Sequence, residues 1–173
     1  MVEKKLNLGC GENRQEGYIG VDKFKTPVVD VEWDLEQYPY PFADGTIDEI
    51  FTSHYIEHHH DIRKFMNECW RILKSRGKMI IVAPYWSSVR ATQDPTHVNF
   101  ISESTFIYYN KAWREANRLD HYLEIKADFE FPFTAIEYVI DPLWLSRNRE
   151  AQEFAMKYYV NVIQDIKITL TKR

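Results

Sequence analysis

Short apolar runs separated by turn signals follow one another through the first half of the chain. These runs predict strands at residues 5–8, 18–21, 28–33, 47–52 and 78–83, and the run at 28–33 is rich in β-branched residues. Between the last two runs, apolar side chains recur at helical spacing, at Ile62, Phe65, Met66, Cys69 and Leu73. Asp61 precedes this helix as a candidate N-cap, and Gly77 is expected to end it in a left-handed conformation. Alternating strands and helices with apolar central strands predict an α/β fold, in which a parallel sheet is covered on both faces.

The second half of the chain is less regular. Residues 85–100 form a long connection without clear periodicity, and such loops in compact domains are often functional. Ser102 is expected to cap a helix that runs to about residue 117. Extended segments are predicted at residues 128–140 and 165–171, with a short amphipathic helix at 150–160 between them.

Composition limits the classes of function. With 173 residues, the chain suits one domain with one core. A formal net charge of −4 and the lack of any run of Lys or Arg argue against a broad nucleic-acid surface. The longest apolar run, residues 79–84, is too short to span a bilayer, and because the first strand begins early we expect no signal peptide. Two cysteines without framework spacing indicate reduced thiols, so we expect a cytoplasmic protein.

The clearest chemical signal is the segment KKLNLGCGENRQEGYIGVDK, residues 4–23. Gly9-Cys10-Gly11 follows the first strand, and glycines allow a tight turn whose backbone N–H groups can approach a ligand. Asp22 lies at the end of the next strand, where an acid can accept hydrogen bonds from ribose hydroxyls. A GxG alone is a weak signal, but its place between a strand and a following acid predicts nucleotide binding.

In this context the segment resembles motif I of class I S-adenosylmethionine (SAM)-dependent methyltransferases. YPYPFADGTIDEIFTSHYIEHH resembles the passage into motif IV, followed by a Glu-His pair, and WRILKSRGKMIIVAPY resembles the next helix and strand. DPTHVNFISESTF resembles a segment of small type 11 methyltransferases. The similarity covers roughly residues 4–110, and the order of the pieces is more specific than any one of them.

The resemblance implies a fold and a domain organisation. The expected fold is a Rossmann-like, doubly wound sheet of seven strands, mostly parallel with an antiparallel final strand. Residues 1–173 would form a single methyltransferase domain, in which residues 85–101 and 141–163 are insertions on the substrate side.

The resemblance also implies that SAM is the cofactor and S-adenosylhomocysteine the product. Asp22 would bind the ribose hydroxyls, and Asp34 would face the adenine amine beside the backbone N–H of Leu35. Ser53 and His54 would lie under the sulfonium and its methyl group. The complete expected cofactor set is Asn7, Gly9, Cys10, Gly11, Asp22, Lys23, Asp34, Leu35, Ser53 and His54.

The sequence departs from the family pattern near the glycine turn, where Asn13 replaces a common third glycine. Asn7 stands where an acid usually precedes the glycines, which weakens the expected contact with the SAM amine. The interval between Gly11 and Asp22 is too short for a full first helix, so we expect a turn there.

Histidines supply the candidate catalytic groups. His54, His58 and His97 could each accept a proton from an attacking hydroxyl or amine, although each could equally be a structural, hydrogen-bonded histidine. The consecutive residues 58–60 do not converge on a helix and no Cys pair accompanies them, so we expect no metal site. The substrate-wall candidates are Tyr55, Tyr85 and Trp86.

The hypothesis that follows is a SAM-dependent methyltransferase acting on the oxygen or nitrogen of a small-molecule or glycan-like acceptor. The Pro-Pro-aromatic motif of nucleic-acid amino-methyltransferases is absent after the fourth strand, where the sequence reads SHYI. One alternative is a SAM-binding module without catalysis, since no base is unmistakable. Another is an enzyme that uses a nicotinamide dinucleotide, which the missing GxGxxG makes less favourable.

Overall fold

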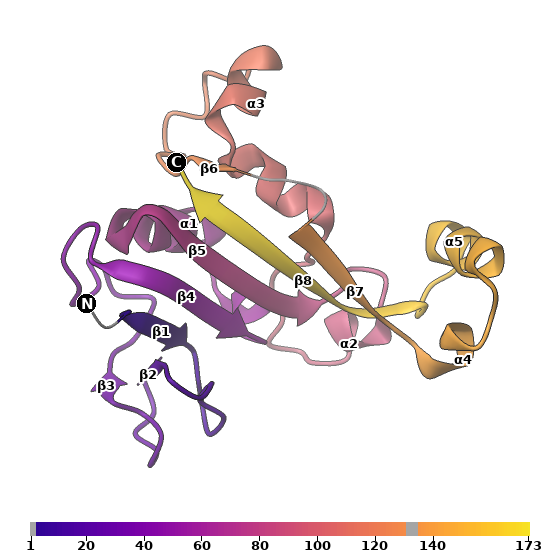
Figure 1. Cartoon of the computed structure of the whole chain (residues 1–173), viewed down its shortest axis with the longest axis horizontal. Coiled ribbons are helices and arrows are strands. Elements are labelled where there is room, and N and C mark those ends of the chain that lie inside the picture. Colours follow the sequence, from indigo (N-terminus) through magenta and orange to yellow (C-terminus); the bar gives the residue numbers. More distant parts are fainter. Residues whose placement is uncertain (1–2, 131–134) are drawn as a thin grey trace.

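One mixed β-sheet organises the computed structural model, which describes residues 3–130 and 135–173 (Figure 1). The strands are β1 (Lys5–Leu8), β2 (Ile19–Asp22), β3 (Val31–Glu32), β4 (Ile47–Ser53), β5 (Leu73–Pro84), β6 (Phe129–Glu130), β7 (Ile136–Ile140) and β8 (Ile163–Lys172). Their order is β3-β2-β1-β4-β5-β8-β6, and β7 also pairs with β8. Strands β1 to β5 are parallel, whereas β8 is antiparallel to β5, β6 and β7. Because β6 and β7 share one edge of β8, eight strands fill seven positions, which confirms the predicted Rossmann-like sheet.

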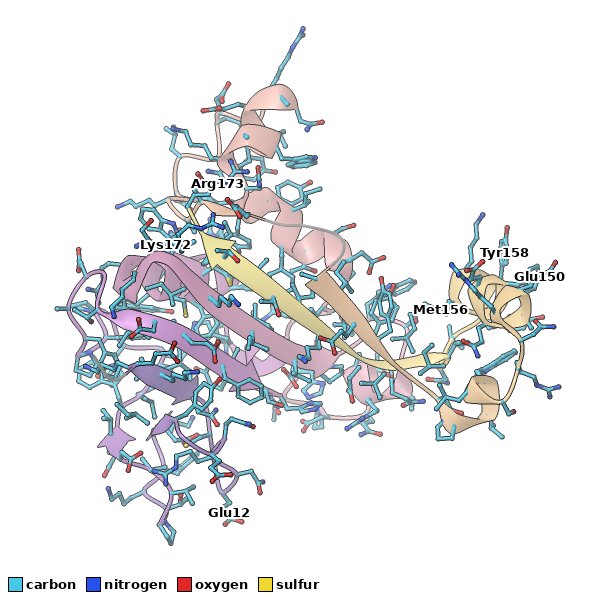
Figure 2. All side chains as sticks on the ribbon, viewed as in Figure 1. Glu12, Glu150, Met156, Tyr158, Lys172 and Arg173 are labelled. Atoms are coloured by element: carbon cyan, nitrogen blue, oxygen red, sulfur yellow. The ribbon has the colours of Figure 1, made fainter. Side chains whose placement is uncertain are left out.

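The helical segments are η1 (Ile56–His58), α1 (Ile62–Ile72), α2 (Val89–Thr92), η2 (Glu103–Tyr109), α3 (Lys111–Ala116), α4 (Pro142–Leu145) and α5 (Arg149–Tyr158). Helices α4 and α5 project beyond one end of β7 and β8 (Figure 1). Met156 and Tyr158 on α5 therefore lie at the opposite end of the molecule from Lys172 and Arg173 (Figure 2). In the described part of the chain, no helix combines the length and apolar character needed to cross a membrane.

The two faces of the sheet differ in burial because side chains alternate along each strand. Paired positions on one face are fully buried, at Leu6, Leu8, Ile50, Thr52 and Met79. Their neighbours on the other face are half-buried or exposed, at Lys5, Glu49, Phe51, Lys78 and Ile80. Helix α1 contributes Phe65, Met66 and Cys69 to the core on the buried face. The helix thus supplies the apolar cover that this side of the sheet requires.

The start of α1 was predicted correctly and its end was not. Asp61 caps the helix, since its side chain accepts hydrogen bonds from the backbone N–H groups of residues 63 and 64 at 3.1 Å. The predicted left-handed cap at Gly77 is wrong, because the helix ends at Ile72 and Leu73 is already extended. Leu73 is fully buried and pairs with Ile47, so tertiary pairing starts β5 earlier than the local signal indicates.

Several element boundaries also differ from the predictions. The predicted strand at residues 28–33 is reduced to Val31–Glu32. The predicted helix at 102–117 divides into η2 and α3, because Asn110 leaves helical geometry and caps α3 by accepting a bond from Trp113 N–H at 2.8 Å. The predicted strand at 128–140 appears as β6 and β7, while residues 131–134 lie outside the described residues.

Truncating Phe65 tests the core between α1 and the sheet. Phe65 is fully buried, so Phe65→Ala should lower the free energy of unfolding by about 3–5 kcal/mol through lost burial and a residual cavity. The matched control is Phe154→Ala on α5, where the ring is 54% exposed and the loss should stay under about 1 kcal/mol. Urea unfolding of both variants measures the difference, and equal losses would contradict this account of the core.

Candidate functional site

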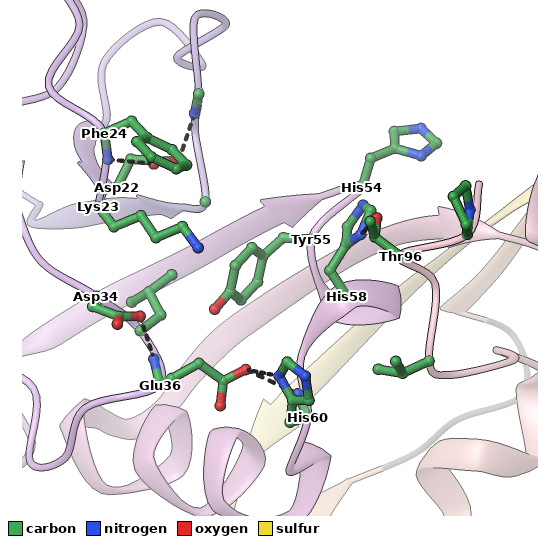
Figure 3. Close-up of a pocket in the computed structure, with 15 residues that line it drawn as sticks. Asp22, Lys23, Phe24, Asp34, Glu36, His54, Tyr55, His58, His60 and Thr96 are labelled. Atoms are coloured by element: carbon green, nitrogen blue, oxygen red, sulfur yellow. Dashed lines mark hydrogen bonds and ion pairs between the residues drawn. The ribbon is translucent and has the colours of Figure 1, made fainter.

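A cavity of about 720 Å³ opens where the parallel strands end (Figure 3). A volume of this size suits a cofactor or a drug-sized ligand. Segments after four strands and one loop contribute to its wall, which consists of Gly9, Gly11, Asp22, Lys23, Phe24, Asp34, Leu35, Glu36, His54, Tyr55, His58, His60, Pro95, Thr96 and Val98. This location follows the rule that ligands of open α/β sheets bind beyond the carboxyl ends of the strands.

The glycine turn after β1 forms one side of the cavity. Gly9 and Gly11 have φ angles of 66° and 53°, in the left-handed region that favours glycine. A Cβ atom on Gly9 would also lie 2.5 Å from the ring of Tyr55, whereas one on Gly11 would meet nothing within 4 Å. Gly9 is therefore required for space as well as for backbone angle.

Asp22 is held by the backbone around it. Its Oδ2 accepts a hydrogen bond from Gly11 N–H at 2.9 Å, and its Oδ1 accepts one from Phe24 N–H at 3.0 Å. A carboxylate has about four lone-pair sites, so both oxygens keep capacity for further donors. Asp22 lines the cavity and at the same time ties the glycine turn to the end of β2.

The wall after β3 is also fixed by local hydrogen bonds. Asp34 Oδ1 accepts a bond from Glu36 N–H at 3.0 Å, and Leu35 is only 3% exposed. Glu36 Oε1 accepts a bond from His60 N–H at 2.9 Å, which joins this wall to the segment after β4. Glu36 and His60 carry no signal in the sequence as cavity residues, since only their contact across the fold marks them as lining residues.

Tyr55 forms the middle of the cavity, between the two groups of lining residues (Figure 3). Its hydroxyl lies 2.9 Å from Nδ1 of His59, and the Tyr38 hydroxyl lies 2.7 Å from Nε2 of the same ring. Burial lowers the pKa of His59 and raises the pKa of Tyr55. Both groups therefore stay neutral at physiological pH, and the ring of Tyr55 supports the glycine turn.

His54 directly follows the carboxyl end of β4 and lies on the opposite side of Tyr55 from Asp22 and Asp34 (Figure 3). It adopts a left-handed φ of 52°, and its N–H donates to the Val82 carbonyl at 2.9 Å. Its Nδ1 lies 3.4 Å from Oε1 of the buried Glu57. The interaction with Glu57 raises the pKa of His54 above its ordinary value, although partial burial opposes the shift.

The loop after β5 completes the site. The backbone N–H groups of Val98 and Asn99 donate to the Glu57 carbonyl at 2.8 and 3.0 Å, which docks the loop on η1. As a result Pro95, Thr96 and Val98 enter the cavity wall. His97 does not line the cavity but packs against His58, with 4.6 Å between ring centroids.

Three predicted cofactor residues lie outside the cavity wall. Asn7 is buried, and its Oδ1 accepts a bond from Gln15 N–H at 2.8 Å, so it holds the turn that replaces a first helix. Cys10 is 5% exposed, and burial raises the pKa of its thiol. Ser53 is the last residue of β4 and is not part of the wall.

The predicted substrate residues Tyr85 and Trp86 are placed away from this cavity. Tyr85 packs edge-on against Tyr138 of β7, with ring centroids 5.8 Å apart, and lines a separate cavity of about 250 Å³ with α5 residues. The side chain of Trp86, next to the ring of Tyr85, is 53% exposed. Tyr85 directly follows β5, which ends at Pro84, and its backbone forms a parallel bridge with Ile101. Tyr55, the third predicted substrate residue, does line the main cavity.

Comparison with known proteins adds a family match. The family model Methyltransf_11, described as a methyltransferase domain, matches residues 19–81. This range begins after the glycine turn and includes β2, α1 and the first part of β5. Among curated proteins, none matches the chain in sequence.

Solved structures share the fold over nearly the whole chain. A SAM-dependent methyltransferase from Archaeoglobus fulgidus is 20% identical, with a TM-score of 0.65, covering 98% of this chain and 86% of that one. The YcgJ protein from Bacillus subtilis is 19% identical, with a TM-score of 0.59 and coverages of 99% and 93%. Phosphoethanolamine N-methyltransferase 2 from Haemonchus contortus, in complex with SAM, is 14% identical, with a TM-score of 0.53 and coverages of 98% and 48%.

The contact between Gly9 and Tyr55 can be tested against a glycine that shares only the backbone angle. Gly17 has a φ of 81° but open space around it, so Gly17→Ala should cost about 1–2 kcal/mol of stability from the backbone alone. Gly9→Ala should cost about 1–3 kcal/mol more, because the new methyl group overlaps the Tyr55 ring. Urea unfolding compares the two, and equal losses would show that the ring contact is unimportant.

Proposed function

We propose that this chain, a class I SAM-dependent methyltransferase, transfers the methyl group to a hydroxyl or amine of a small-molecule or glycan-like acceptor. One observation carries the proposal. A single cavity joins the glycine turn, Asp22 and Asp34 on one side of Tyr55 with His54 and His58 on the other. The half of the cavity that would bind the nucleoside and the half with titratable histidines thus face the same space.

The lining residues fit SAM chemically. Gly9 and Gly11 line the cavity, and the open space beside Gly11 leaves room for the amino-acid half of the cofactor near the backbone. Asp22 keeps free lone pairs for ribose hydroxyls after its two backbone bonds. Leu35 lines the cavity beside Asp34, where the backbone and the edge of its side chain would contact a purine ring. This match of donors, acceptors and apolar surface supports the cofactor roles inferred from the family resemblance.

The chemistry then depends on positioning. SAM supplies a methyl group that is already activated as part of a sulfonium. The protein must hold an acceptor oxygen or nitrogen in line with the bond that breaks, and such alignment alone can supply much of the rate enhancement. His54 can accept a hydrogen bond from the acceptor and orient its lone pair.

The rim of the cavity favours an acceptor with both polar and apolar surfaces. Phe24 is 67% exposed and Val98 is 49% exposed, and both line the opening. Lys23 extends toward the cavity beside Phe24 (Figure 3). A flat apolar ring next to a cation suits a sugar or another small polar molecule with one apolar face.

Calorimetric titration with SAM tests the cofactor half. Asp22→Ala should weaken SAM binding by at least about tenfold, the equivalent of one lost charge-assisted hydrogen bond. The matched control is Asp30→Ala, because Asp30 also accepts a backbone bond at β2, from Gly20 at 2.8 Å, but does not line the cavity. Unchanged affinity in Asp22→Ala, or an absence of SAM binding by the folded wild type, would refute this assignment.

Transfer of radiolabelled methyl groups to a panel of sugars, amines and phenols tests catalysis. With an active acceptor, His54→Ala should lower kcat by about 100-fold or more while SAM affinity changes little. The exposed His121 provides a control, and His121→Ala should retain full activity. SAM binding without transfer to any acceptor would instead support a SAM-binding module without catalysis.

A further inference from the structure

We propose that Glu57, His58 and His97 form a binding site for one divalent cation of the zinc class. One ligand atom from each of these residues lies within 4.8 Å of the others. Glu57 and His58 belong to η1, whereas His97 comes from the loop after β5. The docking of that loop on η1 brings the three side chains together, next to the main cavity.

The buried carboxylate is the first argument for a cation. Glu57 is 1% exposed, and neither of its side-chain oxygens has a hydrogen-bond partner among the described residues. An unpaired carboxylate in such a position is strongly destabilising. His54 forms a long ion pair with this carboxylate, with 3.4 Å between its Nδ1 and Oε1. Among the described residues Glu57 therefore has one distant ion-pair partner and no close hydrogen bond, which leaves its oxygens available to a cation.

The tautomer of His58 also favours a cation. The Thr96 hydroxyl has one proton, which it donates to Asp94 Oδ1 at 2.7 Å. Nδ1 of His58, at 2.9 Å from the same hydroxyl, must therefore donate its N–H to it. In the neutral ring this leaves Nε2 with a lone pair available to a metal.

The ring of His97 has the same tautomer. Its Nδ1 lies 3.1 Å from the carbonyl oxygen of Ala91, which can only accept, so Nδ1 carries the proton. Nε2 again keeps its lone pair. Metal-binding histidines characteristically donate their other N–H to a backbone carbonyl or another oxygen, which fixes the tautomer and the orientation of the ring.

The donor set selects the class of cation. Two imidazoles and one carboxylate are the ligands of catalytic zinc sites that leave a fourth position open. Mg²⁺ and Ca²⁺ prefer oxygen ligands and are disfavoured here. No metal site was expected from the sequence, because consecutive histidines point in different directions. In the structure His59 lies between two tyrosine hydroxyls, and His60 contacts Glu36. The missing ligand was His97, which is distant in sequence.

The position of the site indicates its role. His58 and Thr96 line the main cavity, so a cation held by His58 would face the space assigned to the acceptor. An oxygen of the acceptor could occupy the open position, and coordination would lower the pKa of its hydroxyl. This role rests on the proposed function, whereas cation binding itself does not.

Titration of tag-free protein with Co²⁺, a spectroscopic substitute for Zn²⁺, tests the site. We expect one equivalent of Co²⁺ to bind and to show the visible d–d absorption of a low-coordinate complex. Zn²⁺ should displace the bound Co²⁺, whereas Mg²⁺ should not. Glu57→Gln and His97→Ala should each weaken Co²⁺ binding by at least about 100-fold. The control His121→Ala removes an exposed histidine elsewhere and should leave the Co²⁺ affinity unchanged.

Circular dichroism and SAM titration of each variant separate loss of the site from loss of the fold. His97 does not line the cavity, so folded His97→Ala should keep its SAM affinity. No Co²⁺ binding by the wild type, or binding that persists in both Glu57→Gln and His97→Ala, overturns the proposal. Co²⁺ binding without SAM binding would support the cation site and refute the proposed function, and the reverse pattern would refute the cation site alone.

Discussion

The contact between the Tyr55 ring and the backbone of Gly9 connects the parts of the site. The ring occupies the space that any side chain on residue 9 would need, and its hydroxyl continues to His59 and then to Tyr38. This chain of contacts joins the turn after β1, the end of β4 and the loop after β3. Each of these segments also contributes to the cavity wall, so the cavity keeps its shape only while the contact is maintained.

Short polar side chains take the place of a first helix. Between β1 and β2 the described chain forms only turns, in which Asn7 accepts a bond from Gln15 N–H and Asp22 accepts one from Gly11 N–H. Asp30 accepts a bond from Gly20 N–H within β2. Carboxylates and amides near a turn can satisfy backbone N–H groups that a helix would otherwise pair. The hydrogen bond from Gly11 N–H that stabilises the turn also fixes the position of Asp22 in the cavity wall.

The two halves of the site arise differently. The half that would bind the cofactor is made by the ends of adjacent parallel strands, which the topology brings together. The other half depends on a long loop, which Asn99 fastens by donating to the carbonyls of Ile56 and His59 at 3.0 and 2.6 Å. The proposed cation site lies at this junction of η1 and the loop, where Glu57 meets two imidazoles.

The sequence by itself determined the features that depend on neighbours along the chain. These are the five parallel strands, the start of α1 at Asp61, the glycine turn and the acids Asp22 and Asp34, whose positions after strands place them at one edge of any parallel sheet. Only the tertiary structure decided the end of α1, the placement of Tyr85 against β7, and the meeting of His97 with His58 and Glu57. Those outcomes follow from pairing and packing between distant segments, whose energies exceed local preferences and leave no pattern in the local sequence.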